Sequence, residues 1–126
     1  MKKLPTIAMT PMPEYGYNPI PLILYGEKVH TLRKQRCHGR KEVTVGGERT
    51  GILVEFHGWV EMRQDEFLCA DFADADGFNY EGPWLMQTKH AHNNLRDFLR
   101  HFYGEVPETM FCCYFRVVQR PEEEQK

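Results

Sequence analysis

The chain has 126 residues, of which 41% are hydrophobic and 27% charged, and its formal net charge is −2. This length and composition predict one globular domain and exclude a disordered chain. Serine is absent, which excludes serine-nucleophile hydrolases, and the lack of a long apolar run or leader pattern predicts a cytoplasmic protein with no membrane contact.

The first 21 residues are predicted to form an extended, proline-rich arm. Five of the eight prolines lie here, and proline both lacks a backbone donor and disfavours helix at the residue before it. We expect residues 22–119 to fold as a single domain and residues 120–126 to form a charged, flexible tail.

Short β-prone runs dominate residues 22–62. Gly46 and Gly47 separate two such runs, which is typical of a two-residue hairpin turn because glycine adopts positive φ without strain. Between residues 52 and 62 apolar and polar side chains alternate. The apolar set should therefore face the core, and the other set, which includes Trp59, should face outward.

Residues 66–72 alternate in the same way and are predicted to return as the second strand of a hairpin. Joining the two inner faces through the turn sets the register, because a slip of one residue would expose the apolar set. In that register Trp59 lies opposite Cys69, and His57 lies opposite Asp71.

The hydrophobic period changes to that of an amphipathic helix near Thr88, the expected N-cap, and this pattern ends at Gly104. A final β-prone run follows at residues 110–118. The predicted fold class is α+β: a mostly antiparallel sheet, which could curl into a small SH3-like or OB-like barrel, with one helix near the C-terminus and a last strand. The apolar stripe of the helix comprises Ala91, Leu95, Phe98, Leu99 and Phe102.

Residues 28–41 form a basic segment that holds six lysines and arginines and no acid. As a loop, such a segment suits the phosphates of a nucleic acid, with Tyr25 and His38 nearby to stack on bases. The same charges could instead be neutralised by acids of the chain itself. The candidate nucleic-acid-binding residues are Arg33, Lys34, Arg36, His38, Arg40 and Lys41.

Residues 55–81 carry eight acids and a single base, so the chain is a charge dipole in sequence. Carboxylates on an outward sheet face can imitate a phosphate backbone and occupy the basic groove of a nucleic-acid enzyme. Two aromatic residues predicted to face outward would supply the apolar centre of such an interface. The candidate protein-binding residues are Trp59, Phe67, Glu55, Glu61, Asp71, Asp74 and Asp76.

The residue pattern raises three other candidate sites. Cys69, His57 and Asp71 would give a thiol enzyme, but a flat sheet face offers no cleft and no oxyanion donor. Residues 72–83 resemble a calcium loop in part but lack its first and last ligands. Four cysteines occur without a CxxC spacing, so we expect reduced thiols, no metal and no cofactor.

The leading hypothesis is a small non-enzymatic protein-binding module, such as an inhibitor or adaptor of nucleic-acid-handling machinery of the phage or mobile-element type. The absence of a catalytic constellation favours it over an enzyme. Direct nucleic-acid binding through residues 28–41 is the alternative from a different class. A homodimer is compatible with either hypothesis.

Overall fold

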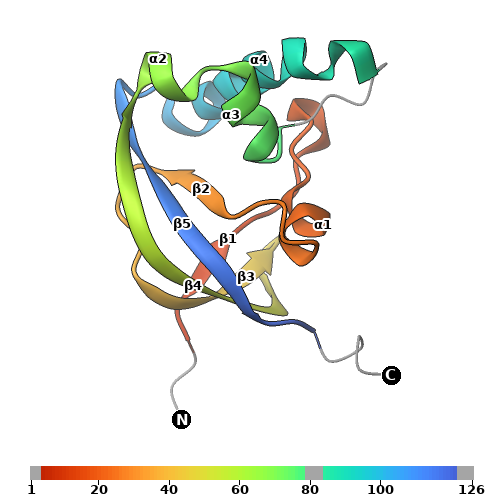
Figure 1. Ribbon diagram of the computed structural model, residues 1–126, viewed down its shortest axis with the longest axis vertical. Coiled ribbons are helices and arrows are strands. Elements are labelled where there is room, and N and C mark those ends of the chain that lie inside the picture. Colours follow the sequence, from red (N-terminus) through yellow and green to blue (C-terminus); the bar gives the residue numbers. More distant parts are fainter. Residues whose placement is uncertain (1–3, 79–83, 122–126) are drawn as a thin grey trace.

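The computed structural model describes residues 4–78 and 84–121, with the side chains of all of these except 84–90. The described strands are β1 (Thr6–Ala8), β2 (His30–Arg33), β3 (Gly39–Val45), β4 (Glu48–Arg63) and β5 (Thr109–Gln119). They form one mixed sheet of order β1-β3-β4-β5-β2 that curls into a half-barrel (Figure 1). β1 runs parallel to β3, and all other neighbours are antiparallel.

The described helical segments are the 3-10 turn η1 (Pro13–Tyr15), α1 (Pro19–Leu24), α2 (Gln64–Phe67), α3 (Ala70–Ala75) and α4 (Trp84–Tyr103). Three of them, α2, α3 and α4, form a layer across one end of the half-barrel, and α1 lies beside the sheet (Figure 1). Within the described ranges, no helix has the length and apolar character needed to cross a membrane.

The predicted α+β fold class is confirmed, and two of its turn signals hold. Gly46 and Gly47 join β3 to β4 with φ of 58° and 83°, a conformation that favours glycine. Gly104 follows the last turn of α4 with φ of 80°. The helix begins at Trp84, however, so Thr88 lies inside it and is not the N-cap.

Two hydrophobic clusters hold the fold together. The first fills the half-barrel between the sheet and α1 and comprises Ile7, Met9, Ile23, Val43, Ile52, Val54, Phe56, Cys113 and Phe115. The second lies between the sheet and the helical layer and comprises Tyr17, Leu32, Phe67, Ala73, Phe78, Ala91, Leu95, Leu99, Met110 and Cys112. Most of the predicted helical stripe is therefore core, but Phe102 at its end is 55% exposed.

The predicted second hairpin is wrong. Residues 64–75 form α2 and α3 instead of a strand. Residues 53–63 of β4 pair with β5 in place of the predicted second strand. Trp59 consequently lies opposite Cys113 and not opposite Cys69.

Capping and burial explain why this segment is helical. The Glu66 Oε1 atom accepts the backbone N–H of Arg63 at 2.8 Å and satisfies a donor at the start of α2. Phe67 is fully buried, and Phe72 packs against the same cluster. In the predicted strand these two rings, five positions apart, would point to opposite faces, so a hairpin with one outward face would bury only one of them.

Part of the segment predicted to be an extended arm, residues 1–21, belongs to the sheet and the core. β1 adds a parallel edge strand, and the backbone N–H of Met9 donates to the Thr44 carbonyl at 2.9 Å. The side chains of Met9 and Tyr17 are buried. The division of the chain into arm, domain and tail stays a prediction.

Candidate functional site

A cavity of 220 Å³ lies where the two edge strands, β1 and β2, approach α4. Five aromatic residues line it together with aliphatic side chains such as Leu32, Leu95 and Leu99; the aromatic residues are Tyr17, Phe78, Phe98, Phe102 and Tyr103. Its polar lining consists of Thr10, Thr31, Arg33 and Asp76. The mixture of a broad apolar wall with a few convergent polar groups is typical of small-molecule sites.

The aromatic wall is built by ring contacts that fix its shape. Tyr17 stacks on Phe78 with centroids 4.5 Å apart and an interplanar angle of 23°. The centroid of the Phe98 ring lies 4.9 Å from that of Phe78 in an edge-on contact and 5.1 Å from that of Tyr17 in a tilted one. It also lies 4.7 Å from the centroid of Phe102. Such contacts stabilise each ring orientation beyond simple burial, so the wall is preformed.

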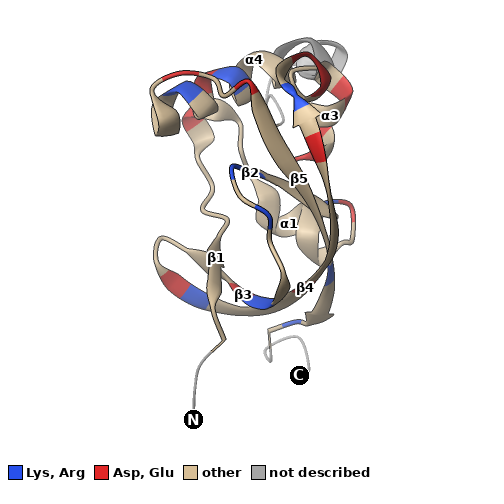
Figure 2. Ribbon diagram, turned by 90° about the vertical axis from the view of Figure 1, so that its left-hand side faces the viewer, with Lys and Arg blue, Asp and Glu red and all other residues tan. Residues whose placement is uncertain are grey.

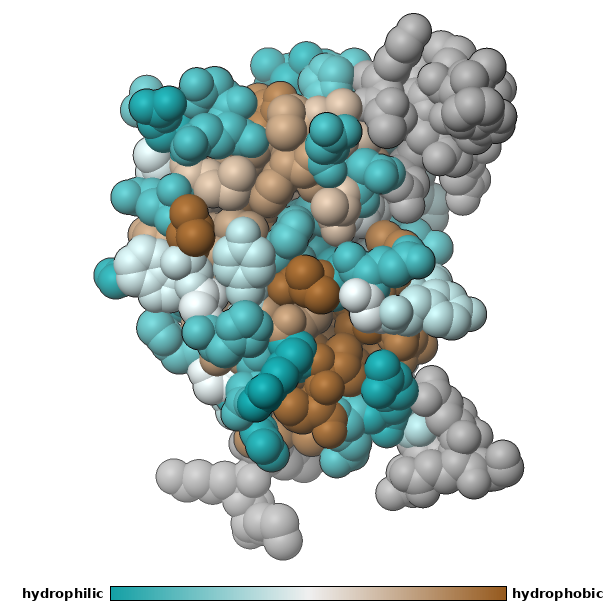
Figure 3. All heavy atoms as spheres, viewed as in Figure 1, coloured by the Kyte–Doolittle hydropathy of each residue, from teal (hydrophilic) through white to brown (hydrophobic). Residues whose placement is uncertain are grey.

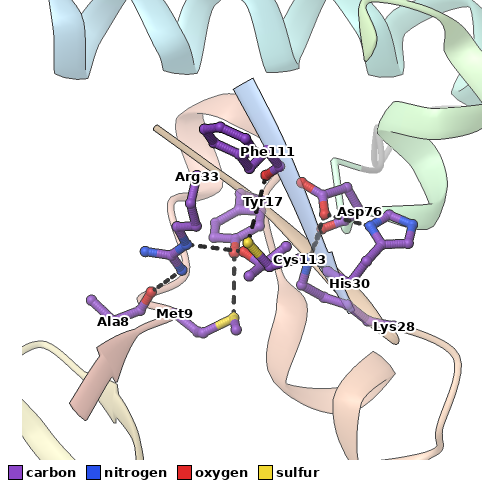
Figure 4. Close-up of polar contacts among 10 residues, drawn as sticks. Ala8, Met9, Tyr17, Lys28, His30, Arg33, Asp76, Phe111 and Cys113 are labelled. Carbon is purple, nitrogen blue, oxygen red and sulfur yellow. Dashed lines mark hydrogen bonds and ion pairs between the residues drawn. The ribbon is translucent and has the colours of Figure 1, made fainter. Parts of the chain in front are cut away.

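A buried ion pair lies beside the polar end of the cavity. The Lys28 ammonium donates to Asp76 Oδ1 at 2.7 Å, to the Asp76 carbonyl at 2.7 Å and to the His30 carbonyl at 2.6 Å. The His30 Nδ1 atom lies 3.1 Å from the same Oδ1 (Figure 4). Lys28 is 1% exposed and Asp76 3%, so both charges have left water. The local fold brings them together because Lys28 lies two residues before the start of β2 and Asp76 caps the end of α3.

Burial and pairing set the charges of this group. Burial lowers the pKa of Lys28 although Asp76 opposes the shift. Burial would raise the pKa of Asp76, but Lys28 and His30 together hold it below its usual range. Burial also opposes protonation of His30, yet hydrogen bonds with Asp76 and Cys112 raise its pKa to about 9. Asp76 is therefore a carboxylate and His30 is protonated at neutral pH.

One oxygen of the Asp76 carboxylate is left for a ligand. Among the described residues, the hydrogen bonds to this side chain all reach Oδ1, and the side chain lines the cavity. A carboxylate oxygen only accepts hydrogen bonds at neutral pH, so Oδ2 can select a ligand that presents an N–H or O–H group.

Beside the cavity, an open groove of 400 Å³ runs along the loop that joins β2 to β3. Figure 2 shows the basic residues of this loop near β1. Arg33 and Ala8 line both the groove and the cavity, so the two spaces adjoin. The Arg33 Nη2 atom donates to the Ala8 carbonyl at 2.7 Å, and this bond links the two edge strands of the sheet. The Arg33 Nε atom donates to the Thr31 hydroxyl at 3.2 Å within β2.

The basic residues of the loop also rest on aromatic rings. The Lys34 ammonium lies 5.0 Å from the Tyr103 ring centroid, and the Arg36 guanidinium lies 4.8 Å from that of Trp59 and 5.5 Å from that of Phe111. These cation–π contacts hold exposed charges near the groove without neutralising them.

The predicted nucleic-acid-binding residues do not all share one place. Arg33, Lys34, Arg36 and Lys41 line the groove. Arg40 instead contacts Glu55 at 3.4 Å, so one base meets the acids of the chain itself. His38 is exposed in the same loop.

The predicted protein-binding surface is not assembled as expected. Phe67 is fully buried in the core and Asp76 is buried in the ion pair, so the predicted outward position of both side chains is wrong. Trp59 is 40% exposed but packs edge-on against Phe111, 5.4 Å between centroids. Glu61 and Asp71 are exposed on different elements, β4 and α3, and Asp74 is half-buried. The Glu55 carboxylate accepts hydrogen bonds from both Arg40 and Arg116.

The hypothetical thiol site is not formed. Cys69 and Asp71 lie at the start of α3, whereas His57 is exposed on β4, so the predicted cross-strand pairing does not exist. In the described parts of the chain no group of three His, Cys, Asp or Glu side chains is arranged to hold a metal ion.

A separate apolar hollow lies beside α1 and is lined by Ile20, Pro21, Leu24, Tyr25 and Arg120. Figure 3 shows hydrophobic side chains gathered over the lower half of the face that carries α1. Tyr25 is 80% exposed there and takes no part in the basic groove.

The ion pair and the cavity were missed by sequence reasoning. The sequence analysis assigns Lys28 to the basic segment and Asp76 to the candidate protein-binding acids, and these residues are 48 positions apart. The sequence carries no local signal that joins them, because their meeting depends on how α3 packs on β2.

No protein-family model and no curated protein matches this sequence. Solved structures that are similar to it include the following two. Protein EF3133 from Enterococcus faecalis V583, of family DUF984, is 15% identical, with 100% of this chain and 84% of that chain covered and a TM-score of 0.64. The ASCH domain from Lactobacillus crispatus JV V101 is 19% identical, with 79% and 70% covered and a TM-score of 0.54. At these identities the likeness shows a shared fold: the chain is a small α+β domain with the architecture of these two proteins.

Proposed function

We propose that the domain binds single-stranded nucleic acid, with one base in the aromatic cavity and the neighbouring phosphates along the basic groove. The observation that carries this proposal is the junction of the two spaces at Arg33 and Ala8. A nucleotide unit has the same two parts, a flat ring and an anion, within one molecule.

The cavity suits a base in size and chemistry. Its 220 Å³ equals the space of about seven water molecules at ~30 Å³ each, which is enough for a flat ring system but not for a duplex. Aromatic walls favour a π-face, and the Asp76 carboxylate accepts a ring N–H or an exocyclic amine. A phosphodiester offers this carboxylate no hydrogen-bond donor, whereas a base does, so we expect the base and not the backbone to enter the cavity.

The groove suits the backbone. Arg33, Lys34, Arg36 and Lys41 line an open surface, and no acidic side chain is among the described residues that line it. Contacts of this kind release counterions and make affinity fall with salt.

The test is fluorescence anisotropy of labelled single-stranded RNA, single-stranded DNA and duplex over a salt series. We expect single strands to bind more tightly than duplex, with affinity that falls steeply as salt rises. Lys34→Gln and Arg36→Gln should each reduce the salt slope by about 1. Arg116→Gln is the matched control, because this exposed arginine lies outside the groove. Absence of binding at low salt, or equal losses with the control, would overturn the proposal.

A second candidate function is favoured by one observation. The Thr31 hydroxyl lines the cavity together with Asp76, and the fully buried Lys28 pairs with Asp76. A hydroxyl near buried ionisable groups is a set from which nucleophiles and bases are drawn, so hydrolysis of a bound carbonyl compound is the reaction class.

Binding without turnover ranks first because Lys28 already donates to three acceptors. The two functions are separated with p-nitrophenyl acetate as a probe ester. Turnover above the buffer rate that disappears in Thr31→Val, while nucleic-acid affinity stays the same, would support hydrolysis. An inhibitor or adaptor role through protein contacts stays a prediction and ranks lower, since Phe67, one of its two anchors, lies in the core.

A further inference from the structure

Two cysteines meet beneath the basic loop. Cys37 lies in the loop between β2 and β3, and Cys113 lies on β5 with its side chain in the half-barrel cluster. The Cys37 sulfur lies 4.0 Å and the Cys113 sulfur 3.8 Å from the same atom, the Gln35 carbonyl oxygen. Both thiols are free.

Their surroundings make the two thiols unequal. A hydrogen bond from Cys113, with the nearby charges of Arg33 and Lys41, lowers the pKa of Cys37 to about 7 although burial opposes it. The hydrogen bond with Cys37 and burial raise the pKa of Cys113. Cys37 also lines the open groove, whereas Cys113 is 0% exposed. The accessible sulfur is thus the nucleophile and the buried one keeps its proton.

We infer that Cys37 and Cys113 form a reversible, peroxide-sensitive thiol pair. The Cys37 thiolate attacks one oxygen of hydrogen peroxide, the O–O bond breaks, and sulfenic acid and hydroxide form. The Cys113 thiol then attacks the Cys37 sulfur, the S–O bond breaks, and the released hydroxyl leaves as water with the thiol proton. The two thiols together lose two electrons, peroxide gains them, and an added dithiol reverses the change.

The fold selects this pair over the other cysteines. Cys112 precedes Cys113 on β5 and points to the opposite face, where it lies near His30 and Tyr114. Cys69 is exposed at the start of α3.

Oxidation would fasten the basic loop to β5. Formation of the S–S bond requires the two sulfurs to close to about 2.05 Å, which draws the loop toward the sheet and moves the neighbouring Arg36 and Lys34. Resting on the proposed nucleic-acid function, the oxidised protein should bind single strands at least about fivefold more weakly than the reduced protein.

The pair is tested by mass spectrometry on the full chain. The protein is treated with hydrogen peroxide, free thiols are blocked with N-ethylmaleimide, and trypsin is added. We expect the peptide of residues 37–40 to be joined to the peptide that ends at Arg116, and dithiothreitol to separate them. That second peptide holds both Cys112 and Cys113, so Cys112→Ala is included and should leave the cross-link intact, as should Cys69→Ser. Cys37→Ser should abolish it.

The outcomes separate this inference from the proposed function. Loss of the cross-link in Cys112→Ala, or oxidation of Cys37 that stops without joining Cys113, would overturn the thiol pair whatever the protein binds. If the cross-link forms but neither redox state binds nucleic acid, the thiol pair stands and the nucleic-acid proposal fails.

Discussion

Two ion pairs of this protein have the same length and different surroundings. Lys28 and Asp76 lie 2.7 Å apart with side chains 0% and 4% exposed, whereas Arg116 and Glu55 lie 2.7 Å apart with side chains 70% and 27% exposed. Distance therefore does not distinguish them. The charges of the first pair have lost their hydration, so each depends on its protein partner for stabilisation. The charges of the second pair are hydrated and screened by salt, so each can lose its partner at little cost. The basic segment 28–41 and the acidic segment 55–81 meet in both settings, because Lys28 pairs with Asp76 inside the protein and Arg40 pairs with Glu55 on its surface.

Removal of Asp76 should have the largest effect. Asp76→Ala leaves the buried Lys28 ammonium without its counterion, and we expect a loss of about 3–5 kcal/mol in the free energy of unfolding. Urea unfolding measures it, with Glu55→Ala as the matched surface variant, for which we expect no loss beyond experimental error. Similar losses in both variants would show that burial does not distinguish the two pairs.

The pH dependence of stability sharpens the contrast through His30. Its pKa is about 9 in the folded protein and 6.5 in a model peptide, so protonated His30 stabilises the fold fully below pH 6.5. This contribution is lost as pH rises through about 9. The lowered pKa of Lys28 acts in the opposite direction, so the informative quantity is the difference between wild type and His30→Gln. That difference should shrink from pH 6 to pH 10 in thermal unfolding, and a constant difference would contradict the raised pKa.

The contribution of the cavity to binding affinity should come from its aromatic wall and should not change with salt concentration. Phe102→Ala removes a ring that is 55% exposed and lines the cavity, so the fold should tolerate it. We expect binding of single strands to weaken by about 1–3 kcal/mol with an unchanged salt slope. Anisotropy titrations at two salt concentrations measure both quantities. A changed slope would mean that the ring positions the basic loop and does not hold a base.

Glu55→Gln should have the smallest effect. It frees Arg40 and Arg116 from their carboxylate, and at roughly 10 Å in water one charge changes binding by about 0.4 kcal/mol, or about twofold. We expect slightly tighter binding of nucleic acid at low salt and no difference at high salt, measured by the same titrations. An effect that persists at high salt would identify Glu55 as a direct contact.

Local patterns were the part of the fold that the sequence could predict. The Gly46-Gly47 turn needs only two residues to be recognised, and the stripe that includes Leu95 and Leu99 repeats often enough to define a helix. Residues 66–72 were too few to separate a strand from two short helices, and the resulting error also placed Phe67 on the surface.

The sequence predicted only those residues of the candidate site that lie close together in the chain. Arg33, Lys34, Arg36 and Lys41 follow one another closely in the chain and do line one groove. The cavity could not be predicted, because its wall combines β1, β2 and α4 with the turn that holds Asp76. Packing between distant segments creates such a site, and no spacing in the sequence records it.

The position of β5 has a consequence for synthesis of the protein. β5 lies between β4 and β2 in the sheet, so β2 has no other strand partner among the described residues. Residues 30–33 leave the ribosome long before residues 109–119. Until β5 has emerged, β2 and the edge of β4 that pairs with β5 expose unpaired backbone groups. The basic groove, which depends on β2, can therefore form only after almost the whole described chain has emerged, so a nascent chain should not bind nucleic acid through it.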